Sequence, residues 1–123
     1  MTTFCLVHGA WHGGWCWERL APELEARGAQ VVAPDLPCED VDAGISAYAD
    51  VVDTALGEAD DVVLVGHSLG GVTIPVVAAR RPVRRLVFLC AFGERSAMAV
   101  QAAHEAGLSD AMHLHHGLST WER

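Results

Sequence analysis

Short apolar runs alternate with segments of helical periodicity along most of this chain, and that alternation restricts the fold more than any other feature. Four runs are apolar at consecutive positions and too short for helices, so they predict buried strands at residues 3–8, 30–33, 62–65 and 85–91. Apolar residues recur at helical spacing between them, at residues 15–27, 46–57 and 69–80. Because the predicted strands are apolar on both faces, we expect an α/β fold, a mostly parallel sheet of about four strands with helices on both faces.

Residues with special backbone preferences mark the ends of the predicted helices. Gly28 is expected to end the first helix, and the hydroxyl of Ser46 to cap the second. Pro82 follows the third helix, which it cannot continue. Four arginines flank this proline: Arg80, Arg81, Arg84 and Arg85. We expect these cations to complement the helix dipole at that end.

The charge and the hydropathy of the chain argue against several classes of partner. Eight basic and 16 acidic residues give a formal net charge of −8, which disfavours a nucleic-acid binder because phosphates would be repelled. No apolar run approaches the roughly 20 residues that span a bilayer, and no signal peptide precedes the first strand. We therefore expect no membrane partner and a cytoplasmic location. Free thiols, and no metal site, are expected of the four cysteines: Cys5, Cys16, Cys38 and Cys90.

The sequence Gly-His-Ser-Leu-Gly-Gly follows the third predicted strand and opens the third predicted helix. A G-x-S-x-G pattern in this strand-to-helix context predicts a nucleophile elbow with Ser68 as the nucleophile. The sharp reversal strains the serine backbone, and Gly66 and Gly70 leave room for the neighbouring chain. The backbone N–H of Leu69, at the start of the helix, is then a donor for a developing oxyanion. The alternative is a glycine-rich turn with an incidental serine.

The loop after the first predicted strand supplies a second candidate donor. An elbow enzyme needs one more backbone N–H from this loop, and we assign it to Ala10. Tryptophans at positions 11, 15 and 17 follow, and they either line a pocket or pack on the core. His67 adjoins the serine in sequence but is expected to point away from it and to be structural.

Four sequence blocks together resemble the α/β-hydrolase superfamily: LVHGAWHGGWCW, APDLP, VGHSLGG and LVFLCAF. The resemblance covers roughly residues 3–93 and is greatest to small esterases grouped with plant methyl-ester esterases and hydroxynitrile lyases. It implies a serine hydrolase that acts on small carboxylic esters without a cofactor, with Ser68 as nucleophile and Ala10 and Leu69 as oxyanion donors. An esterase is preferred over a lyase, because the lyases place other residues at Gly9, His67 and Leu69 and use a lysine, which this chain lacks.

The chain departs from the family's pattern after the fourth predicted strand. The superfamily's triad follows the order Ser, acid, His, and no further strand-like run follows residue 91. We therefore expect a chain truncated before the triad acid and histidine. Residues 1–93 would be the N-terminal half of the hydrolase domain, and residues 94–123 the start of a cap region or a divergent tail. The strand at 85–91 would then be an exposed apolar edge, which favours self-association.

Residues 94–123 contain only isolated candidates for the missing acid and base. Glu94 lies where some members of the superfamily place the acid, although a solvated loop glutamate is the plainer interpretation. His113 is one of several histidines after Ser68 that could act as the base, and nothing in the sequence positions it. Two alternatives therefore stand beside an active esterase. One is a non-catalytic remnant that kept a binding pocket, and the other is a structural subunit that completes its sheet with another chain.

Overall fold

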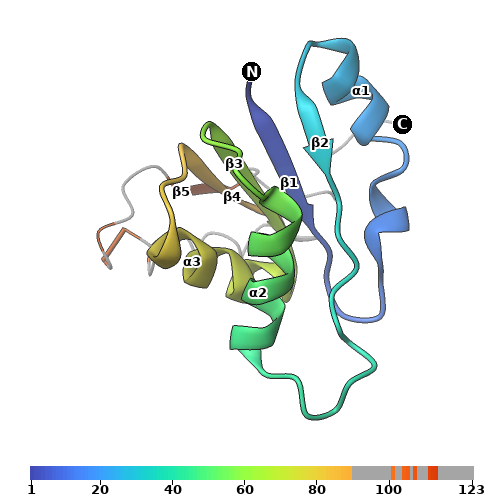
Figure 1. Cartoon of the computed structure of the whole chain (residues 1–123), viewed down its shortest axis with the longest axis vertical. Helices are drawn as coiled ribbons and strands as arrows, with labels where there is room; N and C mark the ends of the chain where they lie inside the picture. Colours follow the sequence, from blue (N-terminus) through green and yellow to red (C-terminus); the bar gives the residue numbers. More distant parts are fainter. Residues whose placement is uncertain (90–100, 102–103, 106, 108–110, 114–123) are drawn as a thin grey trace.

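A parallel sheet of five strands, in the order β2-β1-β3-β4-β5, forms the centre of the computed structural model (Figure 1). The structure describes residues 1–89, 101, 104–105, 107 and 111–113. Its strands are β1 (Thr3–Val7), β2 (Gln30–Val32), β3 (Val62–His67), β4 (Arg85–Leu89) and β5 (Ala111–His113). Every neighbouring pair is parallel, which confirms the predicted α/β class.

Strands β1 and β3 lie side by side in the middle of the sheet and pair in register from Thr3↔Val62 to Val7↔Gly66. Consecutive side chains of β1 are inaccessible to solvent, because the sheet is covered on both faces. Parallel strands that pair in register end at the same level. The loops that follow β1 and β3 therefore meet at the carboxyl end of the sheet.

Helices cover both faces of this sheet (Figure 1). Helices α2 (Ile45–Leu56) and α3 (Gly70–Arg80) lie on one face, and α1 (Ala21–Ala26) with the 3₁₀ helix η1 (Gly14–Trp17) lies on the other. Because successive strand residues point to opposite faces, β1 and β3 contribute side chains to two separate cores. The core under α2 and α3 includes Cys5, Val7, Leu64, Val52 and Ile74, and the opposite core contains Leu6, Val63, Val65 and Trp17.

The predicted helix at residues 15–27 is wrong as a continuous element. The chain forms η1, passes through a turn at residues 18–20, and begins α1 with Pro22 in its first turn. A proline ring collides with the carbonyl four residues earlier and removes an N–H donor, so one helix cannot pass through this position. The other predicted strands and helices before residue 90 agree with the structure to within two residues at each end.

Ser46 does not cap α2 as expected. The helix begins one residue earlier, at Ile45, with Gly44 in the N-cap position and no side-chain cap. The Ser46 hydroxyl instead accepts a hydrogen bond from Nη2 of Arg80, at 3.0 Å, from the neighbouring helix α3. A tertiary contact therefore takes the hydroxyl that a local cap would have used.

The expected exposed edge at residues 85–91 is also wrong, because β5 pairs with β4. The pairing runs from Leu86↔Ala111 to Phe88↔His113. A three-residue strand of Ala, Met and His carries no apolar run, so sequence periodicity could not indicate it. Self-association of the chain stays a prediction, although the strand through which it was expected is paired on this side with β5.

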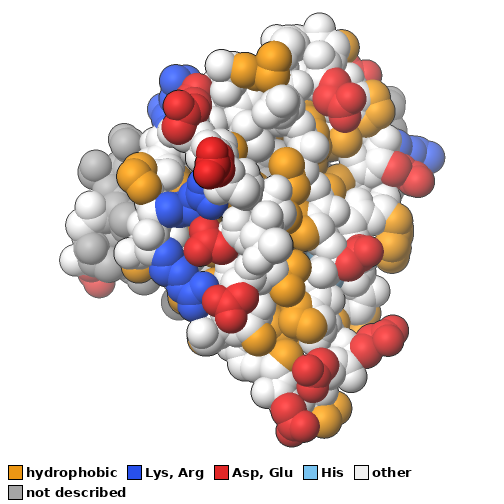
Figure 2. Space-filling model, in the orientation of Figure 1, with side chains coloured by type: hydrophobic (Ala, Val, Ile, Leu, Met, Phe, Trp, Pro, Cys, Tyr) orange, Lys and Arg blue, Asp and Glu red, His pale blue; other side chains and the backbone are white. Residues whose placement is uncertain are grey.

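The arginines around Pro82 pair with acidic residues of neighbouring segments, and Arg80 also lies in the last turn of α3, where a cation was expected to complement the helix dipole. Arg81 donates hydrogen bonds to the carbonyl oxygens of Gly57, at 3.0 Å, and Ala59, at 2.7 Å, where α2 ends. It also pairs with Asp53, and the arginines on either side of it pair with aspartates: Arg80 with Asp50 and Arg84 with Asp61. Blue and red side chains are accordingly interleaved in Figure 2, as expected for paired charges rather than a free basic patch.

Candidate active site

Ser68 lies at the turn between β3 and α3 in a left-handed backbone conformation, with φ of +54°. This conformation is strained for a residue with a side chain. Two backbone hydrogen bonds hold it: the Ser68 N–H donates to the Leu89 carbonyl at 2.8 Å, and the Ser68 carbonyl accepts from Gly71 N–H at 3.0 Å. Ser68 is exposed to solvent at the carboxyl end of β3. The turn therefore presents a hydroxyl above the ends of β3 and β4.

The glycines on either side of Ser68 allow close approach of backbone segments. A Cβ at Gly66 would lie 2.8 Å from backbone atoms of Gly70 and Gly71, and a Cβ at Gly70 would overlap the Val7 carbonyl oxygen. Real Cβ atoms essentially never come so close to backbone. Strand β3, the first turn of α3 and the end of β1 can therefore converge beneath Ser68 only if both positions are glycine.

The loop after β1 passes directly against the serine. A Cβ at Gly9 would lie 3.1 Å from the Cβ of Ser68. His8, which is buried, ties this loop to the segment after β2. Its Nε2 accepts the Leu36 N–H at 3.0 Å, which leaves Nδ1 to donate to the Gly9 carbonyl at 2.7 Å. The two bonds fix the ring tautomer and hold the loop in place.

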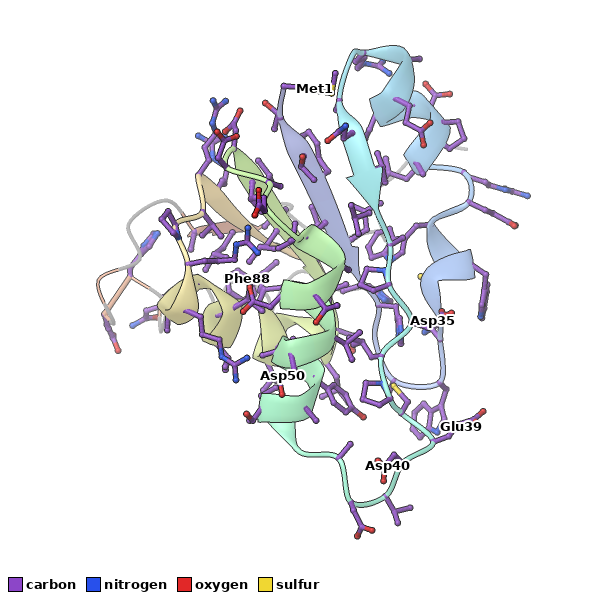
Figure 3. The ribbon with its side chains drawn as sticks, in the orientation of Figure 1. Met1, Asp35, Glu39, Asp40, Asp50 and Phe88 are labelled. Atoms are coloured by element: carbon purple, nitrogen blue, oxygen red, sulfur yellow. The ribbon has the colours of Figure 1, made fainter. Side chains whose placement is uncertain are left out.

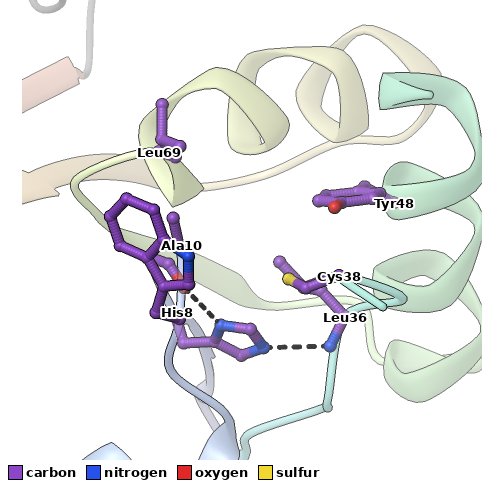
Figure 4. A pocket seen from close by; sticks show the side chains of 8 residues that line it. His8, Ala10, Leu36, Cys38, Tyr48 and Leu69 are labelled. Atoms are coloured by element: carbon purple, nitrogen blue, oxygen red, sulfur yellow. Dashed lines mark hydrogen bonds between the residues drawn. The ribbon is translucent and has the colours of Figure 1, made fainter. Parts of the chain in front are cut away.

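Ala10 and Leu69, the chain neighbours of Gly9 and Ser68, line one pocket of about 200 Å³, and Ser68 itself is not among its lining residues (Figure 4). Leu69 precedes the first residue of α3, where backbone N–H groups have no partner within the helix. Neither the Ala10 N–H nor the Leu69 N–H donates to a backbone carbonyl within the described part of the chain. An oxyanion donor needs such an N–H group, so the described contacts are compatible with the expected role of both residues.

The tryptophans of the first loop divide between the two expected roles. Trp17 is buried in the core beneath η1. Trp11 and Trp15 are exposed, at 95% and 64% of their surface, and Trp11 lines the pocket. The loop that carries them is pinned to the segment after β2 by the Gly14 N–H, which donates to Asp35 Oδ1 at 2.7 Å. Trp11 therefore forms part of the pocket wall, whereas Trp15 does not line the pocket and its ring lies 5.5 Å from the ring of His12, measured between centroids.

His67 packs away from the pocket. Its ring lies 5.7 Å from the ring of His12 and meets Trp17 edge-on at 6.3 Å, measured between ring centroids. Burial, reinforced by the charge of His12, lowers the pKa of His67 below its ordinary value of 6.5. Among the described residues, no histidine or carboxylate is hydrogen bonded to the Ser68 hydroxyl.

The two tail candidates are only partly located. Glu94 lies outside the described residues. The backbone of His113 lies in β5, in register with Phe88 of β4. The candidates that the structure does bring together are therefore Ser68, Ala10 and Leu69, with the glycines beneath them.

Cys38 and Tyr48 line the pocket opposite Ala10 and Leu69, and sequence reasoning did not single them out as site residues (Figure 4). They belong to the segment after β2 and to α2, far from the elbow in sequence. The neighbouring Cys38 side chain raises the pKa of the Tyr48 hydroxyl. The helical spacing of Tyr48 indicated only a core-facing position, and no local pattern marks Cys38.

None of the helices in the described part of the chain is long and apolar enough to cross a membrane. The described residues also contain no group of three histidine, cysteine, aspartate or glutamate side chains that could hold a metal ion. Cys5 is fully buried in the core, and burial raises its pKa to about 12.

A parallel α/β sheet with a strained serine between strand and helix is the architecture of α/β hydrolases. Comparison with known proteins agrees: the model of the "Alpha/beta hydrolase family" matches residues 6–123. The chain belongs to the alpha/beta hydrolase family.

Relatives in this family include named esterases. The chain is 43% identical over 103 residues to the "Carbendazim hydrolyzing esterase" of Nocardioides sp. (strain SG-4G), which covers 75% of this chain and 43% of that protein. It is 38% identical over 102 residues to "Methylesterase 1" of Arabidopsis thaliana, and this match covers 72% of this chain and 39% of that protein. The chain thus spans about two fifths of the length of these curated relatives.

A solved structure shows the same arrangement. The crystal structure of a pyrethroid hydrolase from Sphingobium faniae JZ-2 superimposes with a TM-score of 0.65 and 34% sequence identity. The match covers 75% of this chain and 41% of that one. The resemblance to esterases of the α/β-hydrolase superfamily, inferred from the four sequence blocks, is therefore confirmed.

Proposed function

We propose that this chain carries the nucleophile and the oxyanion donors of a serine hydrolase that cleaves small carboxylic esters through an acyl-Ser68 intermediate. The observation that supports the proposal most is the left-handed backbone of Ser68 between β3 and α3, with φ of +54°. This strain persists because Gly66 and Gly70 allow three backbone segments to converge beneath the serine. The esterase names of its relatives agree with this activity.

In the proposed reaction the Ser68 hydroxyl oxygen attacks the ester carbonyl carbon and gives its proton to a general base. The carbonyl oxygen becomes an oxyanion that accepts hydrogen bonds from the backbone N–H groups of Ala10 and Leu69. Collapse of this tetrahedral intermediate breaks the ester C–O bond, and the alcohol leaves with the proton from the base. Water then attacks the acyl-serine by the same steps and releases the acid.

The base and the acid that orients it are proposed to come from residues that follow β4 in the chain's order Ser, acid, His, since no described group is hydrogen bonded to the Ser68 hydroxyl. Glu94 and His113 are the candidates within this chain. The division into a hydrolase half at residues 1–93 and a cap or tail at residues 94–123 is part of this proposal. The cytoplasmic location expected from the sequence also stays a prediction.

Labelling of the purified chain with a fluorophosphonate, followed by peptide mass spectrometry, tests this proposal. We expect one adduct, on Ser68, and none in Ser68→Ala. Ala10→Pro removes one proposed oxyanion donor and should abolish labelling, whereas Ala10→Ser keeps the N–H and should label as the parent chain does. Circular dichroism checks that each variant is folded. Full labelling of a folded Ala10→Pro chain would show that this N–H is not a donor.

A non-catalytic binding module is the second candidate. The observation that favours it is the same lack of a described base beside Ser68, combined with a formed pocket. A folded chain that resists the fluorophosphonate but binds small esters at the pocket would establish this candidate instead of the esterase.

A further inference from the structure

The loop after β1 makes a tight reverse turn at Ala10, the residue that carries one proposed oxyanion donor. The turn runs from Gly9 to His12, and the His12 N–H donates to the Gly9 carbonyl at 3.4 Å. Trp11, its third residue, has a left-handed backbone with φ of +59°, whereas Ala10, its second, is not left-handed. This combination defines a type II turn, which prefers glycine or asparagine as its third residue. Tryptophan therefore stands where a side chain strains the backbone.

A type I turn would relieve this strain. It has φ of about −90° at the third residue, and ψ of about −30° in place of about +120° at the second. The change turns over the peptide plane between Ala10 and Trp11, which adjoins the plane that carries the Ala10 N–H. It would also move the Trp11 side chain, which lines the pocket. The form of the turn thus affects both the proposed donor and the pocket wall.

The two ends of the loop are fixed by hydrogen bonds that leave this peptide plane free. The Gly9 carbonyl accepts from Nδ1 of His8 at 2.7 Å (Figure 4). At the other end the Gly14 N–H donates to Asp35 Oδ1 at 2.7 Å, and Figure 3 shows Asp35 beside the loop. The backbone hydrogen bond of the turn itself is long, at 3.4 Å, and so contributes little. None of these bonds involves the plane that would turn over.

The His12 side chain holds that plane. Its Nδ1 donates to the Ala10 carbonyl oxygen at 3.1 Å, and no other hydrogen bond of the described residues reaches this oxygen. The imidazole is itself oriented by its neighbours, because its centroid lies 5.5 Å from the ring of Trp15 and 5.7 Å from the ring of His67. An oriented donor is therefore bound to the carbonyl that would turn over in the relaxed form.

The strain and the hydrogen bond are of similar size. Left-handed backbone at a residue with a Cβ corresponds to a penalty of about 5- to 30-fold in an equilibrium constant. One net hydrogen bond between neutral groups corresponds to about two- to tenfold. The His12 bond therefore offsets a large part of the penalty at Trp11, and its loss should shift the turn toward the relaxed form.

We propose that His12 is a positioning residue of the esterase site, whose side chain holds the turn at residues 9–12 in the strained form that presents the Ala10 N–H to an oxyanion on Ser68. The proposal rests on the esterase function above, which assigns that donor to Ala10. His12 acts through the Ala10 carbonyl and not on the substrate. The strain at Trp11 is what makes the turn depend on this side chain.

His12→Asn and His12→Leu form a matched pair that tests the donor. The two new side chains have nearly the same shape, and only asparagine offers an N–H near the place of Nδ1. NMR of the parent chain should show a strong nuclear Overhauser effect between the amide and Hα protons of Trp11, as a left-handed residue gives. His12→Asn should keep this effect and His12→Leu should weaken it. An effect that is equally strong, or equally weak, in two variants that circular dichroism shows to be folded would overturn the proposal.

The rate at which a fluorophosphonate labels Ser68 tests the link to the oxyanion donor. The serine oxygen displaces fluoride from phosphorus and gives its proton to the base, and the phosphonyl oxygen takes the place of the ester carbonyl oxygen. We expect labelling of His12→Leu to be about two- to tenfold slower than that of the parent, and His12→Asn to stay within about twofold of it. Equal rates for the two variants would overturn the positioning role.

Substitutions of Trp11 separate the backbone strain from the aromatic ring. Trp11→Gly and Trp11→Ala both remove the ring, and only alanine keeps the Cβ that makes the left-handed form unfavourable. His12→Leu should therefore slow labelling when it is added to Trp11→Ala, and should not change the rate when it is added to Trp11→Gly. The same slowing in both backgrounds would show that His12 does not act through this turn.

Failure of this proposal and failure of the esterase proposal give different results. A parent chain that is not labelled at Ser68 would remove the esterase proposal, while the nuclear Overhauser effects still decide whether His12 holds the turn. A labelled parent chain, with identical Overhauser effects and rates in His12→Asn and His12→Leu, would leave the esterase in place and remove the role of His12.

Discussion

Replacing the serine of the elbow with glycine should stabilise the fold, because Ser68 adopts a conformation that glycine adopts without strain. Its φ of +54° falls in the left-handed region. The matched comparison is Ser68→Gly against Ser68→Ala. Both variants lack the hydroxyl, and only alanine keeps the Cβ that makes this conformation unfavourable.

The size of the effect follows from two opposing terms. Left-handed backbone costs a residue with a Cβ about 1–2 kcal/mol. The glycine variant loses about 0.5–1 kcal/mol of this gain in stability, because glycine has more conformational freedom to lose on folding. The net gain of Ser68→Gly over Ser68→Ala is therefore about 0.5–1 kcal/mol. In a chain of 123 residues this corresponds to a rise in Tm of about 2–4 °C.

Urea denaturation followed by tryptophan fluorescence measures this difference. We expect a higher midpoint for Ser68→Gly than for Ser68→Ala, with the same slope, because the surface exposed on unfolding is unchanged. A glycine variant that is equally stable, or less stable, would show that the elbow stores no backbone strain. The argument that glycines and hydrogen bonds hold Ser68 in a forced position would then be refuted.

Three other changes test neighbouring parts of the account. Gly70→Ala should destabilise the chain by about 2–3 kcal/mol, since its Cβ would overlap a backbone carbonyl of β1. The control Gly71→Ala meets only the edge of an aromatic ring and should cost less than about 1 kcal/mol. Equal urea midpoints for the two variants would contradict this expectation. Arg81→Ala should cost about 2–3 kcal/mol, because the Arg81 side chain is 16% exposed and donates hydrogen bonds to carbonyls where α2 ends. Arg84→Ala should cost less than about 1 kcal/mol, because the Arg84 side chain is 61% exposed. Thermal melts that rank the two variants the other way would refute the capping role of Arg81. Burial and a neighbouring histidine lower the pKa of His67 below 6.5, so the unfolded chain binds this proton more readily and stability should fall as the pH drops through 6.5. His67→Gln should remove that part of the loss between about pH 8 and about pH 5, and an unchanged pH dependence of the urea midpoint would show that His67 does not contribute.

The sheet and the elbow could be predicted from sequence because their signals are local. Runs such as Val62–Val65 are apolar at every position, and G-x-S-x-G follows that run directly, so strand, turn and helix are read from consecutive residues. The glycine at position 70 then allows another backbone segment to lie directly beneath the turn. The close approach of Gly70 to Val7 gives this expectation a physical basis.

The features that sequence missed depend on contacts between distant segments. Ser46 binds Arg80 instead of capping its own helix, and β5 forms from three residues without a β pattern because β4 offers an edge. Cys38 and Tyr48 become pocket residues only when α2 packs beside the loop after β1. Local propensity carries no information on such meetings, which tertiary packing decides.

Mass spectrometry of the chain quenched in acid after mixing with p-nitrophenyl acetate tests the central claim most directly. The account predicts one acetyl group per chain, located on Ser68 by peptide mapping and absent from Ser68→Ala. An unmodified folded chain, or an acetyl group carried only by another residue, would contradict the claim that Ser68 is the nucleophile of an ester hydrolase.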